Sequence, residues 1–547
     1  MLPAMVEVKR QFDWQWVLLW CIIVLALLYA RPPMPIDETR YLSVAWEMWH
    51  IHNFLVPHIN GEPYSQKPPL LFWFIHLLWS VFGVSEWAGR LVGPLFALGS
   101  MALTIKLARL LWPGQVQIKQ AAAYILLGFW LWTVLASLTM FDTLLTFFSL
   151  LSLISLLQAA KGVSIWPWIG LGLSMGLGIL AKGPVIFLFV VPPIILAPWW
   201  HRQHCISWRR WFTSALLALA GGLSLAASWA LPAALAGGNG YSQAILFSQT
   251  AGRMVSSFAH KRPFYWYLLW TPLLFFPWFF YPPSWRDWQK ATADQSIRFC
   301  LCALIPPLLL LSFVSGKQIH YILPILPISA LLLARIIVIS AYTTKYEKIP
   351  IVAVFFALSV FLLIISYLPL HGGDKEILRH IPKWLALIPL GCGAGLLVFK
   401  QPRSALTSIK VLSLFLIILT VALHLVVASP LHNLFDQSAV GKALNNLQAK
   451  GETVAVFPPQ LSDQFQFAGR LSEPLVALDS MYEISLWSQQ HPRAFCLIFT
   501  KDRLVALTLG KGFIRPYRGG WLVLRPASGF PLGWAKPLQR AKKSPLR

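Results

Sequence analysis

The segment Pro68–Gly83, PPLLFWFIHLLWSVFG, decides how often this chain crosses a membrane and on which side its loops lie. It is strongly apolar but only sixteen residues long, whereas a helix needs about 20 residues to cross a bilayer. If it crossed, every later loop would change sides and the basic loops would face outward, against the usual cytoplasmic excess of Lys and Arg. We therefore predict an interfacial or re-entrant helix, with a short true span as the alternative.

The composition indicates a helical protein that crosses a membrane many times. Of its 547 residues, 57% are hydrophobic and 12% are charged, and the mean hydropathy is +0.62. Soluble domains are nearer half apolar and a quarter charged. Long apolar runs of this kind cross bilayers as helices. We predict about thirteen spans, at 14–30, 88–110, 120–138, 143–160, 164–181, 184–200, 213–233, 263–282, 299–315, 321–341, 350–369, 384–399 and 411–428.

The net charge of +25 does not indicate a nucleic-acid partner. Lys and Arg lie mainly in short loops between the predicted spans, where orientation in the membrane and contact with lipid phosphates explain them better. The six cysteines are scattered and show neither a disulfide framework nor zinc-site spacing.

The basic loops fall on one side of the predicted spans, which we assign to the cytoplasm together with the N-terminus. After an odd number of spans, the polar segment 430–547 lies outside, in the periplasm of a bacterium. We therefore divide the chain into a transmembrane domain, 1–429, and a C-terminal domain, 430–547. Residues 31–87 form the first outer loop. The predicted location is the bacterial inner membrane.

Two outer segments carry acids. The stretch PIDETRYLSVAWEM places Asp37 just after the first span and directly before a predicted helix, 38–50, with an apolar stripe. Asp37 either caps this helix or takes part in chemistry, and the two roles are compatible. Asp142, in LTMFDTLLTFF, lies at another outer turn, where a polar turn residue is the plain alternative. Two acids that enter one site from different helices suit general-base or electrostatic work on a hydroxyl or a sugar ring.

Cationic side chains also gather on the outer side. Any one of them is explained by snorkelling to lipid headgroups, but together they suit the neutralisation of a phosphate or pyrophosphate leaving group. No Walker loop or Rossmann glycine pattern is present. Because nucleotide donors are cytosolic, an outward-facing transferase needs a donor carried on lipid, and a polyprenyl-phosphate sugar meets that need. The cations are Lys67, Lys182, His260, Lys261, Arg262, Lys317 and His320.

At these residues the chain resembles the C-type integral-membrane glycosyltransferases that use polyprenyl-phosphate sugars. It most resembles the branch with the aminoarabinose lipid A transferases, which is related to the protein O-mannosyltransferases. The stretches that carry the resemblance, across roughly 30–330, are IDETRYLSVAWEM, PHINGEPYSQKPPLLFWF, LTMFDTLLTFF, GLGILAKGPV, HKRPFYWYL and SGKQIHYILPILP.

The resemblance implies an all-α polytopic membrane bundle whose first outer loop carries two interfacial helices. It also implies a small periplasmic α/β domain at the end of the chain. Within 430–547 the pattern of apolar residues predicts a helix at 438–449 and short strands at 452–457, 474–478, 494–499 and 521–524.

The resemblance further implies one outward-facing site, in which we assign Asp37 and Asp142 to catalysis. Lys67 would contact the donor phosphate, and we place Arg40, Lys182 and Lys317 with it. We expect the cavity and the acceptor to be contacted by Glu38, Tyr64, His260, Arg262, His320 and Tyr321.

Gln66 departs from the branch, which usually carries an acid before the lysine. In the branch this acid and the loop histidine can hold a metal ion. A neutral amide oxygen is a poor partner for that purpose. We therefore predict that no cofactor is required and leave a divalent metal open, with Gln66 and His260 as weak candidates. The departure also weakens the transfer of aminoarabinose and lipid A specificity to this chain.

We predict a monomeric, lipid-embedded enzyme that transfers one sugar, with inversion, from a polyprenyl phosphate to an envelope acceptor on the periplasmic face. The sugar 4-amino-4-deoxy-L-arabinose and the acceptor lipid A are one pair; another glycan or a protein is the alternative acceptor. A transporter or flippase of a lipid-linked substrate is the competing class, but the chain has no internal repeat of the usual kind. A binding or assembly protein of the envelope is the third.

Overall fold

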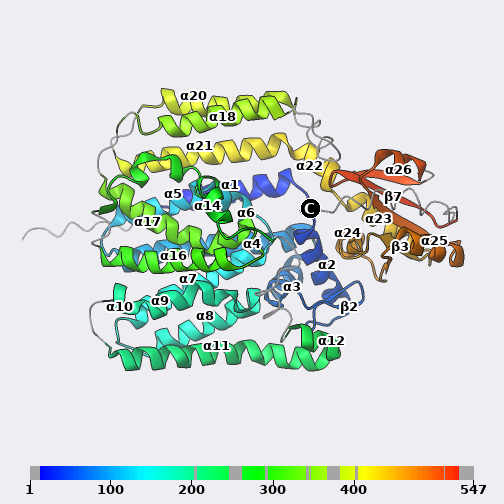
Figure 1. Ribbon diagram of the computed structural model, residues 1–547, viewed down its shortest axis with the longest axis horizontal. Helices are drawn as coiled ribbons and strands as arrows, with labels where there is room; N and C mark the ends of the chain where they lie inside the picture. The colour runs from blue at the N-terminus through cyan, green and yellow to red at the C-terminus, as the bar shows by residue number, and fades with distance from the viewer. Residues whose placement is uncertain are drawn as a thin grey trace, which may run out of the picture.

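The computed structural model describes residues 13–201, 206–245, 261–289, 294–340, 344, 346–365, 367, 382–400, 404–509 and 512–528. These residues form a bundle of roughly aligned helices with a small sheet domain at one end (Figure 1). One large apolar core runs through the bundle, and separate cores lie under the sheet. The prediction of a polytopic helical membrane protein is confirmed.

Seven helices in the described part of the chain are long and apolar enough to cross a membrane. They are α4 (Glu86–Leu111), α7 (Phe141–Ala159), the run Trp166–Ile195 made of α8 (Trp166–Lys182) and α9 (Ile186–Ile195), α11 (Trp208–Ala236), α16 (Gln295–Phe313), the run Ile319–Ile339 that ends in α17 (Leu326–Ile339), and α21 (Ala405–Val426). Four shorter apolar helical segments are α1 (Gln15–Ala30), α3 (Leu70–Phe82), α18 (Ile349–Ile365) and Lys383–Val398, which contains α20 (Leu387–Val398). The count of about thirteen spans stays a prediction.

Several of the predicted spans are divided in the structure. The range 120–138 covers most of α5 (Val116–Gly128) and all of α6 (Trp130–Leu135), and the range 184–200 covers α9 and the short α10 (Ala197–Trp200). The range 263–282 contains α14 (Trp266–Leu274) followed by short 3-10 turns. Pro277, Pro282 and Pro283, which follow α14, have no N–H to donate to a helical hydrogen bond, and this disfavours a continuous α-helix through the range. The remaining short helices are α12 (Gly238–Gln243) and α22 (Ala428–Phe435).

The first loop forms α2 (Asp37–His50), a hairpin of β1 (His58–Ile59) and β2 (Glu62–Pro63), and α3. Pro68–Gly83 therefore contains a helix of 13 residues. Helix α3 lies beside α2 at the end of the bundle that carries the sheet domain (Figure 1). It buries Phe72, Ile75 and Trp79, and His76 Nε2 lies 2.9 Å from the carbonyl oxygen of Ala45 in α2.

The C-terminal part is a five-stranded sheet in the order β4-β3-β5-β7-β6. Strand β3 runs parallel to β4 and β5, whereas β7 is antiparallel to β5 and β6. The strands are β3 (Val454–Phe457), β4 (Val476–Ala477), β5 (Phe495–Thr500), β6 (Phe513–Tyr517) and β7 (Gly520–Pro526), with helices α23 (Ser438–Gln448), α24 (Gln466–Gly469), α25 (Met481–Gln490) and α26 (Arg503–Thr508). The four predicted strands and the helix at 438–449 lie in these elements. Strand β6 was not predicted.

Candidate active site

Asp142 lies in the first turn of α7 and is 2% exposed. Lys182, the last residue of α8, donates a hydrogen bond to its Oδ1. Helix α8 ends there because Gly183 has a φ of +73°, a conformation that favours glycine. His320 Nε2 lies 3.9 Å from the other carboxylate oxygen of Asp142. Three segments far apart in the sequence thus bring an acid, a lysine and a histidine together.

Two lysines within electrostatic range of Asp142, Lys182 and Lys67, lie over aromatic rings. Lys182 Nζ lies 4.6 Å from the centroid of the Tyr321 ring, and Lys67 Nζ lies 5.7 Å from the centroid of the Phe141 ring. A cation over an aromatic face is stabilised by the ring quadrupole. The predicted residues Lys67, Lys182 and Tyr321 therefore lie around the start of α7.

Asp37 is the first residue of α2, and no side chain caps this helix with a hydrogen bond. The interpretation of Asp37 as a helix cap is therefore wrong, because the capping position belongs to Ile36. Asp37 Oδ1 instead accepts a hydrogen bond from the Tyr41 hydroxyl, 3.2 Å away and one turn along the helix. His320 lies within electrostatic range of Asp37 as well as of Asp142.

Tyr41 bonds to Asp37 and packs against Phe141, the neighbour of Asp142, although the sequence did not indicate a role for it in the site. Its ring packs edge-on against Phe141, with centroids 4.8 Å apart. Burial raises the pKa of Tyr41 well above its ordinary value, and the charges of Asp37 and Asp142 and the hydroxyl of Tyr64 add to the shift. The available signal was its spacing of four residues from Asp37, which puts both on one face of a helix.

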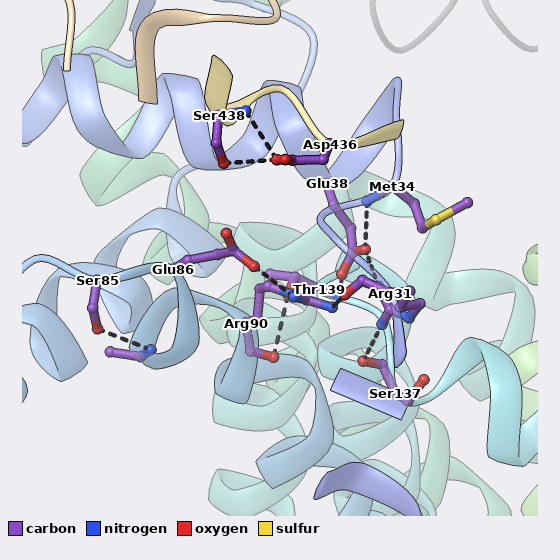
Figure 2. A network of polar contacts seen from close by, with 11 residues as sticks. Arg31, Met34, Glu38, Ser85, Glu86, Arg90, Ser137, Thr139, Asp436 and Ser438 are labelled. Atoms are coloured by element: carbon purple, nitrogen blue, oxygen red, sulfur yellow. Dashed lines mark hydrogen bonds and ion pairs between the residues drawn. The ribbon is translucent and has the colours of Figure 1, made fainter. Parts of the chain in front are cut away.

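Glu38 belongs to a buried polar network between α2 and the segment that leads into α7 (Figure 2). Its carboxylate accepts hydrogen bonds from the Arg31 guanidinium, from Met34 N at 2.9 Å and from Thr139 N at 2.8 Å. Arg31 also donates to the carbonyl oxygen of Ser137 at 2.9 Å. Glu38 is 1% exposed. In the described part of the chain, its oxygens are thus bonded within the protein, and its predicted contact with the acceptor has no support here.

Arg90 extends this network in α4. It donates to the Arg31 carbonyl oxygen at 2.9 Å and to Glu86 Oε1 at 2.6 Å (Figure 2). Burial by itself would raise the pKa of Glu38, but Arg31, Arg90 and the two backbone N–H groups hold that pKa below its ordinary value. The network therefore keeps Glu38 ionised inside the protein.

The other predicted phosphate ligands have protein partners of their own. Arg40 Nε lies 3.6 Å from Asp463 Oδ2, in the C-terminal domain. Lys317 is 3% exposed and donates to the carbonyl oxygens of Arg262 at 3.1 Å and Val314 at 2.6 Å. Burial lowers the pKa of Lys317. Lys317 thus ties the segment after residue 260 to the end of α16, and its contact with a phosphate stays a prediction.

The remaining predicted residues are more dispersed. Tyr64 is buried, with its ring 6.3 Å from that of Phe72. Arg262 and Gln66 have exposed side chains. His260 lies outside the described residues. Within the described ranges no group of three or more His, Cys, Asp or Glu side chains is arranged to hold a metal ion.

Comparison with known proteins places this geometry in context. The family model described as dolichyl-phosphate-mannose-protein mannosyltransferase matches residues 66–230. The undecaprenyl phosphate-alpha-4-amino-4-deoxy-L-arabinose arabinosyl transferase of Erwinia tasmaniensis is 28% identical over 313 residues, which is 55% of this chain and 54% of that protein. The protein of the same name from Pseudomonas aeruginosa is 29% identical over 314 residues, 55% of each chain. The chain thus spans about half the length of the curated relatives that it matches.

The fold agrees over a longer range. The crystal structure of ArnT from Cupriavidus metallidurans bound to undecaprenyl phosphate matches with a TM-score of 0.74 at 17% identity, and the match covers 95% of this chain and 99% of that one. This chain therefore shares its fold with that protein, which agrees with the predicted resemblance to the C-type integral-membrane glycosyltransferases. Within that class the chain resembles the undecaprenyl phosphate-aminoarabinose transferases, by sequence over half its length and by fold over nearly all of it.

Proposed function

We propose that the protein is a glycosyltransferase that moves one sugar from a polyprenyl phosphate to an acceptor in the bacterial envelope. The observation that carries this proposal is the group of Asp142, Lys182 and His320, with Asp37 within electrostatic range. The names of the relatives, with undecaprenyl phosphate as the donor lipid, and the fold of ArnT support it.

In the proposed reaction an acceptor oxygen attacks the anomeric carbon of the donor sugar. The bond between that carbon and the phosphate oxygen breaks, and the polyprenyl phosphate leaves with the electron pair. Lys67, Lys182 and Arg40 would offset the charge that builds on the leaving phosphate. If the acceptor is a hydroxyl, Asp37 takes its proton; if it is a phosphate, Asp37 orients it or balances positive charge on the sugar ring.

We propose Asp142 as the fixed negative charge of the site. Its carboxylate is engaged by Lys182, which makes it less suited than Asp37 to accept a proton. The pair also places an ammonium group in the site without leaving either charge alone in an apolar environment. If the acceptor is a hydroxyl, we assign the role of general base to Asp37, whose carboxylate accepts one hydrogen bond from the described residues.

The proposed orientation puts this site on the periplasmic face of the inner membrane. About thirteen spans, a cytoplasmic N-terminus and a periplasmic C-terminal α/β domain agree with the basic loops on the opposite side. Aminoarabinose and lipid A are the sugar and acceptor that we propose first, because the relatives are named for that sugar. Transfer to a protein is the second candidate, and the match of residues 66–230 to the protein mannosyltransferase model favours it.

The replacement Asp37→Asn tests the proposal. In vesicles that contain the protein, undecaprenyl phosphate-linked sugar and lipid A as the acceptor, we expect transfer to fall by about 100-fold or more. The variant should fold normally because it loses little packing. Glu62→Gln, in the exposed part of the same loop, is the matched control and should transfer at the normal rate. Near-normal transfer by a folded Asp37→Asn protein would refute the catalytic role of Asp37.

A second experiment identifies the sugar and the acceptor together. Mass spectrometry of lipid A, other envelope glycans and envelope proteins, with and without this protein, should reveal one product that gains the mass of a monosaccharide. A pentosamine on lipid A supports the first candidate, and a hexose on a protein supports the second. Unchanged glycans with an altered distribution of a lipid-linked sugar across the membrane would favour a transporter instead.

A further inference from the structure

The C-terminal domain is joined to α2 through a short segment, residues 462–475, that we name the docking segment. The Asn60 side chain pairs with the backbone of Leu475 in both directions, at 2.9 Å from its Nδ2 to the carbonyl oxygen and at 2.7 Å from the Leu475 N–H to its Oδ1. Trp46 in α2 donates to the carbonyl oxygen of Leu471 at 2.9 Å. These contacts hold the docking segment against α2, which carries Asp37, and against the turn of the β1–β2 hairpin that contains Asn60.

The ring of Phe467 strengthens this junction. It stacks on Trp79 of α3 with centroids 5.5 Å apart and an interplanar angle of 6°. The Arg470 guanidinium lies 3.8 Å from the Phe467 centroid and 5.1 Å from that of Trp46. The docking segment is therefore held by both helices of the first loop, so its polar side chains keep a defined position beside α2.

Asp463 and Gln464 of the docking segment face the first turns of α2. Asp463 Oδ2 lies 3.6 Å from Arg40 Nε, and the two side chains are 24% and 17% exposed. Gln464 Oε1 accepts a hydrogen bond from Thr39 at 2.6 Å. Gln464 is 2% exposed, and its Nε2 has no hydrogen-bond partner among the described residues. The C-terminal domain thus adds an acid and a buried amide next to Arg40, one turn from Asp37.

The contact between Asp463 and Arg40 is a loose one. At 3.6 Å it is an ion pair without a hydrogen bond, and Arg40 Nε has no hydrogen-bond partner in the described part of the chain. Asp463 Oδ1 accepts from the Ser462 hydroxyl at 3.2 Å, and Glu47 lies within electrostatic range as a like charge. A phosphate that binds the guanidinium through two parallel hydrogen bonds would be a better partner than this carboxylate.

We propose that Asp463 is the resting counter-ion of Arg40 and competes with the donor phosphate for it, so that the C-terminal domain helps to set the affinity for the lipid phosphate. This inference rests on the proposed role of Arg40 as a donor-phosphate ligand. No covalent bond changes in this exchange. The donor phosphate pairs with the Arg40 guanidinium, and the Asp463 carboxylate turns to solvent. When the phosphate leaves, Asp463 pairs with Arg40 again.

Binding of undecaprenyl phosphate in detergent micelles to the full-length protein tests the exchange. Asp463→Asn removes the competing charge, so we expect binding about three- to tenfold tighter, the size expected of a partly exposed ion pair. Arg40→Gln should weaken binding by a similar factor or more. In the Arg40→Gln background Asp463→Asn should change nothing, because the group for which it competes is absent. In transfer assays, Asp463→Asn should lower KM for the donor.

Asp436→Asn is the matched control. Asp436 forms a similar ion pair, at 3.7 Å with exposures of 26% and 27%, but its partner is Arg515 of β6 and not a residue of α2. The Asp436→Asn variant should bind undecaprenyl phosphate as the natural protein does. Asp463→Ser is the second variant if the Asn variant folds poorly.

Two results would overturn the inference in different ways. If Arg40→Gln weakens binding but Asp463→Asn leaves it unchanged or weakens it, Asp463 does not compete and the proposed phosphate site stands. If Arg40→Gln leaves binding unchanged, both the exchange and the assignment of Arg40 to the donor phosphate are wrong. The transfer assay with Asp37→Asn is independent of both results, so the proposed activity is judged separately.

Discussion

Glu38 accepts a hydrogen bond from the backbone N–H of Thr139 at 2.8 Å, across 101 residues of sequence. Glu38 is the neighbour of Asp37, and Thr139 lies three residues before Asp142. This bond therefore ties the backbone that carries one candidate acid to the backbone that carries the other (Figure 2). Arg31 donates hydrogen bonds to both the Glu38 carboxylate and the Ser137 carbonyl oxygen, and so connects the same two backbone segments a second time.

We expect Glu38→Gln to destabilise the protein strongly. The replacement keeps the size of the side chain, but it leaves Arg31, which is 4% exposed, without its counter-charge. Removal of one partner of a buried ion pair lowers the free energy of unfolding by about 3–5 kcal/mol. Thermal unfolding in detergent measures this loss, and Glu62→Gln in the exposed hairpin should stay within about 0.5 kcal/mol of the natural protein. A normal Tm for Glu38→Gln would show that the network contributes little.

The same residue predicts a pH dependence. The pKa of Glu38 in the folded protein lies below its ordinary value of 4.5, so its stabilising effect is complete above that ordinary value. It is lost as the pH falls through the lower, folded pKa. The Tm difference between the natural protein and Glu38→Gln should therefore be constant from about pH 7 to about pH 5 and shrink below about pH 4.5. A difference that already closes near pH 6 would contradict this assignment.

Asp142 and Lys182 should behave as one unit. Their side chains are 3% and 9% exposed and hydrogen-bonded to each other, so either replacement alone leaves a buried charge. We expect Asp142→Asn and Lys182→Met to lower stability individually, and the double variant to lose about 1–3 kcal/mol less than the sum of the two. Transfer should remain low in all three.

Lys410→Met provides the control for this cycle. Lys410 pairs with Asp13 at 2.9 Å, near the N-terminal end of α1 and therefore at the end of this helix that is far from Arg31. Removal of the Lys410 charge should leave transfer unchanged. Additive effects of Asp142→Asn and Lys182→Met would mean that the two residues act independently.

Much of this site follows from the sequence, because parity of the spans predicts which loops share a face. Asp142, Lys182 and His320 were expected on one side, and the structure brings their side chains together. Asp37 was expected at the start of a helix and is found there. These predictions needed only the positions of apolar runs and charged loops.

Other features depend on tertiary packing that the sequence does not reveal. Glu38 points into the protein because of the way α2 packs against the turn at Ser137–Thr139, and the spacing of residues in the sequence does not predict that packing. Asp463 meets Arg40 across more than 400 residues, from a loop without periodicity. Strand β6, FIRPY, was missed because Arg515 and Pro516 interrupt the alternation that predicts strands.

The position of α3 gives a sharp prediction about topology. If Pro68–Gly83 is interfacial, three predicted spans separate Glu62 from Val163, and the two residues lie on opposite sides of the membrane. If the segment crosses, four spans separate them and they lie on the same side. Lys501, in the C-terminal domain, follows nine further predicted spans after Val163, so it should share the side of Glu62 only in the interfacial arrangement.

Single cysteines at these positions, in a protein without its native cysteines, distinguish the two arrangements. Glu62 and Lys501 are exposed and Val163 is 88% exposed, so all three should react when accessible. With a membrane-impermeant maleimide added to cells whose outer membrane has been opened, we expect labelling at 62 and 501 but not at 163. Residue 163 should react only after the inner membrane is permeabilised. Labelling of 62 together with 163, without 501, would mean that α3 crosses the bilayer, and the basic loops would then lie outside against the usual charge bias.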